Sequence, residues 1–224
     1  PPLVNQTFIT LNIVIFFVSV LAQWILVPGA RGFYDVIWAL GFIPVYFMSG
    51  ERLHTLITSM FLHGSIAHLL GNMLFLYIFG DNVEAVMGRL RYAVFYIVSG
   101  LAASMIHTLY ALLFDPSSLI IPAVGASGAI SGVLGAYIVI FPWGRVRVVV
   151  FWGWIPLFMS LPAIVYIGFW FLYQLLMGLM TAATGVSLGV AFWAHIGGFI
   201  AGLLLANFFI DRRRLAMARY AYIY

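Results

Sequence analysis

Among the polar side chains within or beside the long apolar stretches of this 224-residue sequence, eight stand out as candidates for chemistry, and their types limit the chemistry available. Polar groups at such positions are costly in a membrane and are candidates for functional sites by default. The eight are His63, His68, Asn72, His107, Ser127, Ser131, Gln174 and His195. A serine and a histidine can act as nucleophile and base, and two side-chain donors can stabilise an oxyanion.

Acidic residues are missing from the middle of every apolar stretch. All of them lie in or next to predicted loops: Asp35, Glu51, Asp81, Glu84, Asp115 and Asp211. This distribution argues against a proton relay, a cation pathway or a pair of catalytic aspartates. The sequence also has no His-Glu-x-x-His motif and no cysteine. A metal site on His63, His68 and His195 is a weak alternative without an acidic second shell, so we expect no metal and no cofactor.

Small residues recur at helical spacing beside the candidate serine and the candidate histidine. The first series is Gly125, Gly128, Gly132 and Gly135. The second series is Ala194, Gly198 and Gly202. Close packing of two such faces would bring Ser127 and His195 together. Ordinary helix packing explains the same spacing about equally well, so this pattern alone leaves both interpretations open.

A third stretch favours chemistry over packing alone. His68 and Asn72 are four residues apart on one helix face, behind the predicted N-cap Ser65 and five residues after His63. Two donors on one face suit a developing oxyanion. His68, Ser127 and His195 also fall at similar depths, in the outer half of their stretches. His107 and Gln174 show no partner in the sequence, and we interpret them as packing residues.

The composition identifies an integral membrane protein, because 65% of the residues are apolar and only 7% are charged. A spanning helix needs about 20 apolar residues. The stretches that qualify are residues 7–27, 66–86, 90–113, 124–141, 148–176 and 187–209. We therefore predict an all-α bundle of six transmembrane helices that forms a single domain over residues 1–224. The basic residues form no contiguous stripe, which argues against nucleic acid as a partner.

The arginines predict the orientation of the six helices. Eight of the ten fall on one side: Arg89, Arg91, Arg145, Arg147, Arg212, Arg213, Arg214 and Arg219. Only Arg31 and Arg52 fall on the other side, so we expect both termini in the cytoplasm of a cell-membrane protein. The connection over residues 28–62 is long and aromatic, which predicts a partly helical loop at the outer interface.

Motifs from three of these helices together resemble the rhomboid family of intramembrane serine proteases. The matching segments are residues 60–72, Gly125-Ala126-Ser127-Gly128, and Ala194-His195-Ile196-Gly197-Gly198 followed by Gly202. Residues 80–91, with Glu84 and Gly88, also resemble the family's connection between its second and third helices. The resemblance covers nearly the whole chain, and an ordered set of motifs is far more specific than Gly-x-Ser-Gly alone.

The resemblance implies a role for each matched residue. Ser127 would be the nucleophile and His195 its general base, while His68, Asn72 and the Ser127 backbone N–H would form the oxyanion hole. His63 would support the first loop and a water-filled cavity. Two positions depart from the family pattern. His54-Thr55 replaces a Trp-Arg pair, with Arg52 close by, and Ser131 replaces an aromatic residue that stacks on the histidine in some members.

These residues predict an endopeptidase that cleaves other membrane proteins in or next to their transmembrane segments. Substrates would enter laterally, past the fifth helix and the loop over residues 176–186, with Pro156 and Pro162 as flexing points. An inactive relative that binds or escorts transmembrane helices would share the scaffold but lack the serine or the histidine. A small-molecule transporter would show paired halves and intramembrane charge.

Overall fold

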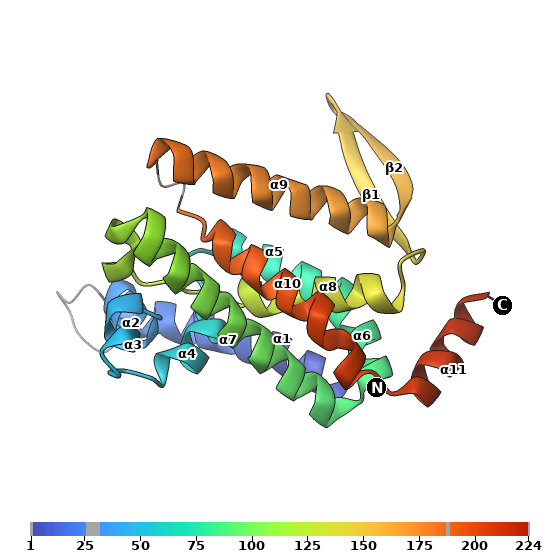
Figure 1. Cartoon of the computed structure of the whole chain (residues 1–224), viewed down its shortest axis with the longest axis horizontal. Coiled ribbons are helices and arrows are strands. Elements are labelled where there is room, and N and C mark those ends of the chain that lie inside the picture. Colours follow the sequence, from blue (N-terminus) through green and yellow to red (C-terminus); the bar gives the residue numbers. More distant parts are fainter. Residues whose placement is uncertain (1, 26–31, 187–188, 224) are drawn as a thin grey trace.

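The computed structural model describes residues 2–25, 32–186 and 189–223, and it is predominantly helical (Figure 1). The bundle contains the helices α1 (Leu3–Ile25), α7 (Arg89–Phe114), α8 (Ser127–Ile140), α9 (Ala163–Thr184) and α10 (Phe192–Phe209). Between α1 and α7, one further long helix consists of three consecutive segments: α5 (Ile66–Phe75), the π-helical turn η2 (Leu76–Gly80) and α6 (Asp81–Met87). A final helix, α11 (Arg212–Ile223), follows. Within the described residues, five spans are long and apolar enough to cross a membrane, and α8 is a shorter sixth helix of 14 residues.

Helix α8 lies at the centre of this bundle, packed between α7 and α10. Every residue from Gly128 to Tyr137 is buried, as expected for a helix that is apolar on all sides. The described N- and C-terminal regions lie at one end of the bundle, and the short helices between residues 33 and 58 lie at the other (Figure 1). This arrangement fits the predicted even number of crossings. Val27, Arg31 and Ser187, at the edges of predicted segments, lie outside the described residues.

Glycines let α8 and α10 approach to backbone contact. A Cβ added to Gly198 would collide with the carbonyl oxygen of Gly128, and one on Gly202 would collide with that of Gly132. The predicted small-residue faces therefore meet. Gly125 does not belong to this face, because it precedes α8 and lies against His68 instead.

The prediction of one helix over residues 148–176 is wrong in its first half. Strands β1 (Arg145–Trp152) and β2 (Ile155–Pro162) form an antiparallel hairpin there, and α9 begins only at Ala163. Consecutive β-branched valines at 148–150 favour a strand. Gly153, with φ of 61°, forms the turn between the strands.

Two further predictions change with the start of α9. Pro156 and Pro162 lie in β2 and cannot act as flexing points within a helix. The expected loop over residues 176–186 is helical as far as Thr184, where Gly185 ends α9 in a left-handed conformation.

The first loop is partly helical, as predicted, with α2 (Phe33–Leu40), α3 (Pro44–Met48), α4 (Thr55–Thr58) and the 3₁₀ turn η1 (Ser59–Phe61). Arg52 anchors it: its guanidinium donates to the carbonyl oxygens of Trp38 and Ala39 and lies 5.0 Å from the ring centre of Tyr46. Arg52 thus holds the loop although His54-Thr55 departs from the family pattern.

A buried carboxylate joins α1 to α6 at the opposite end of the bundle. Glu84 accepts hydrogen bonds from the backbone N–H groups of Val4 and Asn5, at 3.1 and 2.7 Å. These groups belong to the first turn of α1, where a negative charge is favourable. The Asn5 side chain donates to Asp81 and accepts from the Tyr92 hydroxyl, at 2.6 Å in each case.

We expect Glu84→Ala to destabilise the bundle by about 2–3 kcal/mol, because it leaves buried donors without a charged acceptor. The loss should lower the midpoint of thermal or denaturant unfolding in detergent micelles. Glu51→Ala, which removes an exposed acid in the first loop, is the matched control and should leave the midpoint unchanged. Equal midpoints for the two variants would show that Glu84 does not hold α1.

Candidate active site

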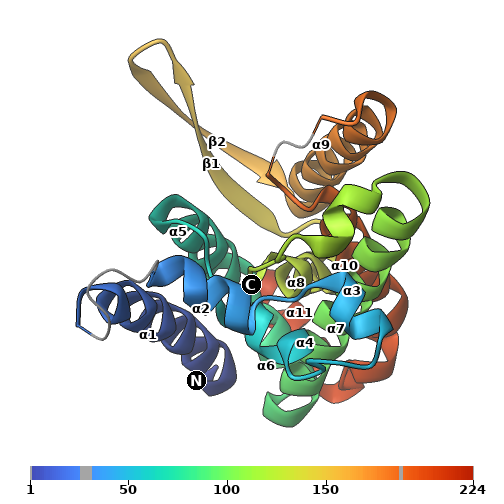
Figure 2. The same ribbon diagram turned by 90° about the vertical axis from the view of Figure 1, so that its left-hand side faces the viewer.

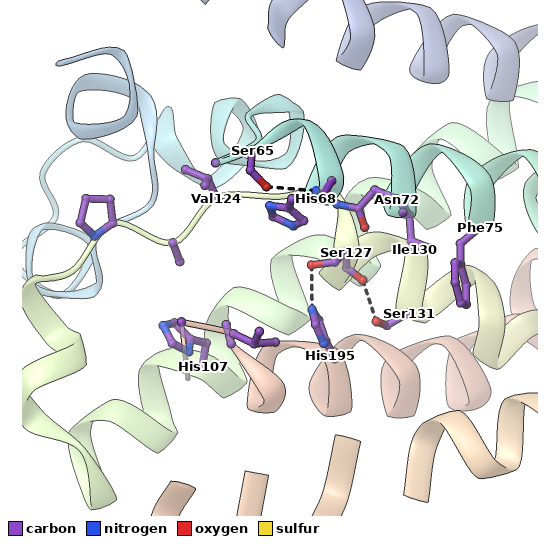
Figure 3. Close-up of a pocket in the computed structure, with 18 of the residues that line it drawn as sticks. Ser65, His68, Asn72, Phe75, His107, Val124, Ser127, Ile130, Ser131 and His195 are labelled. Atoms are coloured by element: carbon purple, nitrogen blue, oxygen red, sulfur yellow. Dashed lines mark hydrogen bonds between the residues drawn. The ribbon is translucent and has the colours of Figure 1, made fainter. Parts of the chain in front are cut away.

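A serine and a histidine from two different helices are in hydrogen-bond contact. Ser127 is the first residue of α8, and His195 lies in the first turn of α10. The Ser127 Oγ and His195 Nε2 atoms are 2.8 Å apart (Figure 3). This is the contact expected if the small-residue faces of the two helices pack together.

The turn before α8 brings His68 close to Ser127. Gly125 has φ of 134°, which a side chain would make unfavourable. A Cβ at this position would stand 2.8 Å from Cε1 of His68 and 3.4 Å from Oγ of Ser127. Glycine at residue 125 is therefore required by both the backbone conformation and the close approach of the histidine ring.

Gln174 supplies the partner of His195 that sequence reasoning missed. Its Oε1 atom lies 2.8 Å from Nδ1 of His195, and the side chain is buried. An amide oxygen only accepts, so Nδ1 carries the proton and Nε2 is left to accept from the Ser127 hydroxyl. The sequence signal was available, since Gln174 is an amide within an apolar helix.

Trp170, one turn before Gln174 on α9, lies beside the same imidazole. The ring centres of Trp170 and His195 are 6.3 Å apart. Ser131, which stands where some family members have an aromatic residue, instead donates to the Ser127 carbonyl oxygen at 2.6 Å. In this chain the aromatic neighbour of the histidine thus comes from α9 and not from α8.

Helix α5 presents the two predicted donors beside Ser127 (Figure 3). Its N-cap is Ser65, as predicted, whose Oγ accepts from the His68 backbone N–H at 3.1 Å. Asn72 follows one turn after His68, and its buried Nδ2 group has no hydrogen-bond partner among the described residues. An unpaired buried donor is costly unless a ligand or water uses it.

His63, which precedes α5, is buried next to His68. His63 is 1% exposed, and its ring centre lies 5.1 Å from that of His68.

A cavity of about 720 Å³ lies beside the serine and the histidine. Ser127, His195, His68 and Asn72 form its polar wall, and apolar residues including Phe75 and Trp170 form much of the remainder. Phe75 comes from α5 and Trp170 from α9, with ring centres 6.5 Å apart. The cavity therefore lies between α5 and α9, with the serine at its inner wall.

His107, from α7, also lines this cavity, but it makes no hydrogen bond to Ser127 or His195 in the described part of the chain. Over the same residues, no three His, Asp or Glu side chains are grouped closely enough to hold a metal ion. The chemistry that the site can offer is therefore a hydroxyl nucleophile, an imidazole base with a fixed tautomer, and neighbouring donors for an anion.

The fold and the site define a multi-pass helical membrane protein with a serine–histidine pair in a cavity between its helices. Residues 50–212 match the Rhomboid domain, and the chain belongs to the rhomboid family.

The similar proteins include both a protease and an inactive relative. Over 158 residues the chain is 32% identical to RHOMBOID-like protein 4 of Arabidopsis thaliana, covering 70% of this chain and 34% of that protein. It is 32% identical over 161 residues to Rhomboid protease AarA of Providencia stuartii, covering 68% and 54%. Inactive rhomboid protein 1 of Drosophila melanogaster is 30% identical over 96 residues, covering 42% of this chain and 6% of that protein. The chain thus spans only part of the length of its relatives.

Proposed function

We propose that this protein is an intramembrane serine protease that hydrolyses peptide bonds in or next to transmembrane segments of other membrane proteins. The observation that carries this proposal is the 2.8 Å contact between Ser127 Oγ and His195 Nε2 at the wall of a cavity. An inactive family member that only binds transmembrane helices has no need of a paired nucleophile and base.

In the proposed reaction, His195 Nε2 accepts the hydroxyl proton as Ser127 Oγ attacks the carbonyl carbon of the scissile bond. The resulting oxyanion receives hydrogen bonds from His68, from Asn72 and from the Ser127 backbone N–H, which as the first in α8 has no partner within its helix. His195 then gives the proton to the leaving amine, and water hydrolyses the acyl-enzyme by the same steps in reverse.

Gln174 acts in this scheme as a positioning residue. Its Oε1 holds the Nδ1–H of His195, so the imidazole presents its basic nitrogen to Ser127. The site thus has a neutral orienting group where many serine hydrolases have a carboxylate.

The cavity between α5 and α9 is the proposed point of substrate entry. A helical peptide bond is shielded, so the substrate must unwind to place its carbonyl carbon beside Ser127. Small or helix-breaking residues near the cleavage site are expected for this reason. We place the arginine-rich end of the bundle in the cytoplasm of a cell, which puts Ser127 in the outer half of the membrane.

A reconstituted cleavage assay tests this function. The purified protein in phospholipid vesicles is incubated with a single-pass reporter, and the products are identified by mass spectrometry. We expect one cut in or next to the transmembrane segment. Binding of the reporter without any cut, across several unrelated transmembrane segments, would favour the alternative of an inactive helix-binding relative.

We expect His68→Ala and Asn72→Ala each to lower kcat by up to about 10²–10³-fold, the loss typical of one oxyanion donor. KM should change much less, because a donor to the oxyanion acts mainly in the transition state. Initial rates over a range of reporter concentrations measure both constants. If both variants raised KM alone, these residues would belong to substrate docking.

We expect Gln174→Leu to lower kcat by about 10-fold or more, because a near-isosteric apolar side chain cannot hold the Nδ1–H group. Gln174→Glu provides a readout that a packing role would not give. A carboxylate beside Nδ1 stabilises the protonated imidazole, so the acidic fall of activity should move to higher pH. Gln6→Leu, which changes an exposed glutamine on α1, is the matched control. An unchanged pH profile for Gln174→Glu would exclude the positioning role.

A further inference from the structure

The hairpin of β1 and β2 is apolar on both of its faces. Val149 pairs with Phe158 on one face, and Val150 pairs with Leu157 on the other. Phe158 is 81% exposed, and Trp154 in the turn is 99% exposed. At the base of the hairpin, Val146 lies in the core and Val148 packs against it.

A hairpin with two exposed apolar faces needs apolar surroundings on both faces at once. An isolated two-stranded hairpin is marginal in water, and these exposed side chains would form a large apolar patch. Its contacts with the helices of the described chain are mainly to α9, next to its base. Full immersion in hydrocarbon is also unfavourable, because the outer edge of each strand carries unpaired N–H and C=O groups. The interface of a bilayer satisfies both requirements, since it offers acyl chains and water at the same depth.

The position of the hairpin matches such an interface. It leaves the bundle at the end where α9 begins, and it runs across the direction of the helices instead of along it (Figure 1). In the second view it extends outward between α5 and α9 (Figure 2). Residue Ala163 follows β2 directly and starts a candidate membrane span, so a bilayer around that span would have its boundary near the base of the hairpin.

The positive charges at the base of the hairpin indicate which kind of phospholipid would bind there. Arg145 and Arg147 are both exposed, and Trp143 next to them is 73% exposed. Tryptophan prefers the headgroup level, and exposed arginines attract anionic headgroups. The starts of α7 and α11 lie at the same end of the bundle and carry further arginines: Arg89, Arg91, Arg212, Arg213 and Arg214.

We propose that the β1–β2 hairpin is a membrane-docking element that lies within the interface, with the apolar side chains of both faces among the acyl chains and Arg145 and Arg147 on anionic phospholipid headgroups. The hairpin thereby fixes the height and tilt of α9, whose N-terminus it precedes. This role does not depend on proteolysis. The competing occupant is a substrate segment, because the hairpin extends from the gap between α5 and α9.

The absence of cysteine from the chain makes a direct test available. Spin labels are attached to Trp154→Cys or Phe158→Cys, and collision rates with oxygen and with a water-soluble nickel complex are measured. The vesicles contain phosphatidylcholine alone or with phosphatidylglycerol. Ser117→Cys, exposed in the 3₁₀ turn η3 (Pro116–Ile120) at the opposite end, is the aqueous reference. Leu204→Cys, 68% exposed on α10, is the lipid reference.

We expect oxygen-to-nickel collision ratios at both hairpin positions that are several-fold above Ser117→Cys and below Leu204→Cys. Phosphatidylglycerol should raise them further, and Arg145→Gln with Arg147→Gln should abolish that increase. Ratios equal to the aqueous reference in both lipids would overturn the proposal. Aqueous ratios that rise only when a transmembrane peptide is added would also overturn it and would assign the hairpin to a protein partner.

Discussion

Ser127→Ala should abolish proteolysis while the protein stays folded. Loss of a serine nucleophile lowers kcat by a factor on the order of 10⁴ or more. The fold should tolerate the change, because Ser127 is only half-buried and its hydroxyl bonds to His195 alone among the described residues.

Cleavage of the reporter and labelling by a fluorophosphonate measure the effect separately. The wild-type protein should be labelled at Ser127, and the variant should show neither labelling nor cleavage. Ser131→Ala is the matched control, since it removes a second hydroxyl one helical turn away and leaves the nucleophile in place. Turnover near the wild-type rate in Ser127→Ala would end the serine-protease proposal.

The helical membrane bundle and the approach of α8 to α10 could be predicted because they depend on patterns local to each segment. Apolar length gives the spans, and the glycines beside Ser127 and His195 mark where two helices touch. The depth of each polar residue follows from the helix rise of about 1.5 Å per residue. Each of these predictions uses only the residues within one segment and does not require the position of other segments in the fold.

The hairpin was missed because an apolar run does not distinguish a strand from a buried helix. Residues 148–176 read as one long span, and only the valines and Gly153 indicated that a hairpin precedes the helix. Because the start of α9 was not known from the sequence, the face of α9 that meets α10 was not known either. Gln174 could therefore not be placed beside His195, which lies 21 residues later in the chain.

His195→Ala should also remove turnover, by a factor on the order of 10⁴ or more, because the hydroxyl of Ser127 loses its proton acceptor. The wild-type protein should show the pH dependence of that base in the cleavage assay. A protonated imidazole cannot accept a proton, so activity is lost as the pH falls and returns as it rises. On the acidic side, the logarithm of kcat should rise with pH with a slope of one, for a single group.

Two controls separate this base from folding and from the other histidine of the cavity. Binding of an uncleavable substrate analogue should lack the acidic fall, because docking needs no free base. His107→Ala removes a buried histidine that lines the same cavity, and it should leave the acidic fall at the same pH. The profile is measured in detergent beside the fluorescence of the folded protein. An acidic fall that followed unfolding, or that moved in His107→Ala, would remove His195 from the role of base.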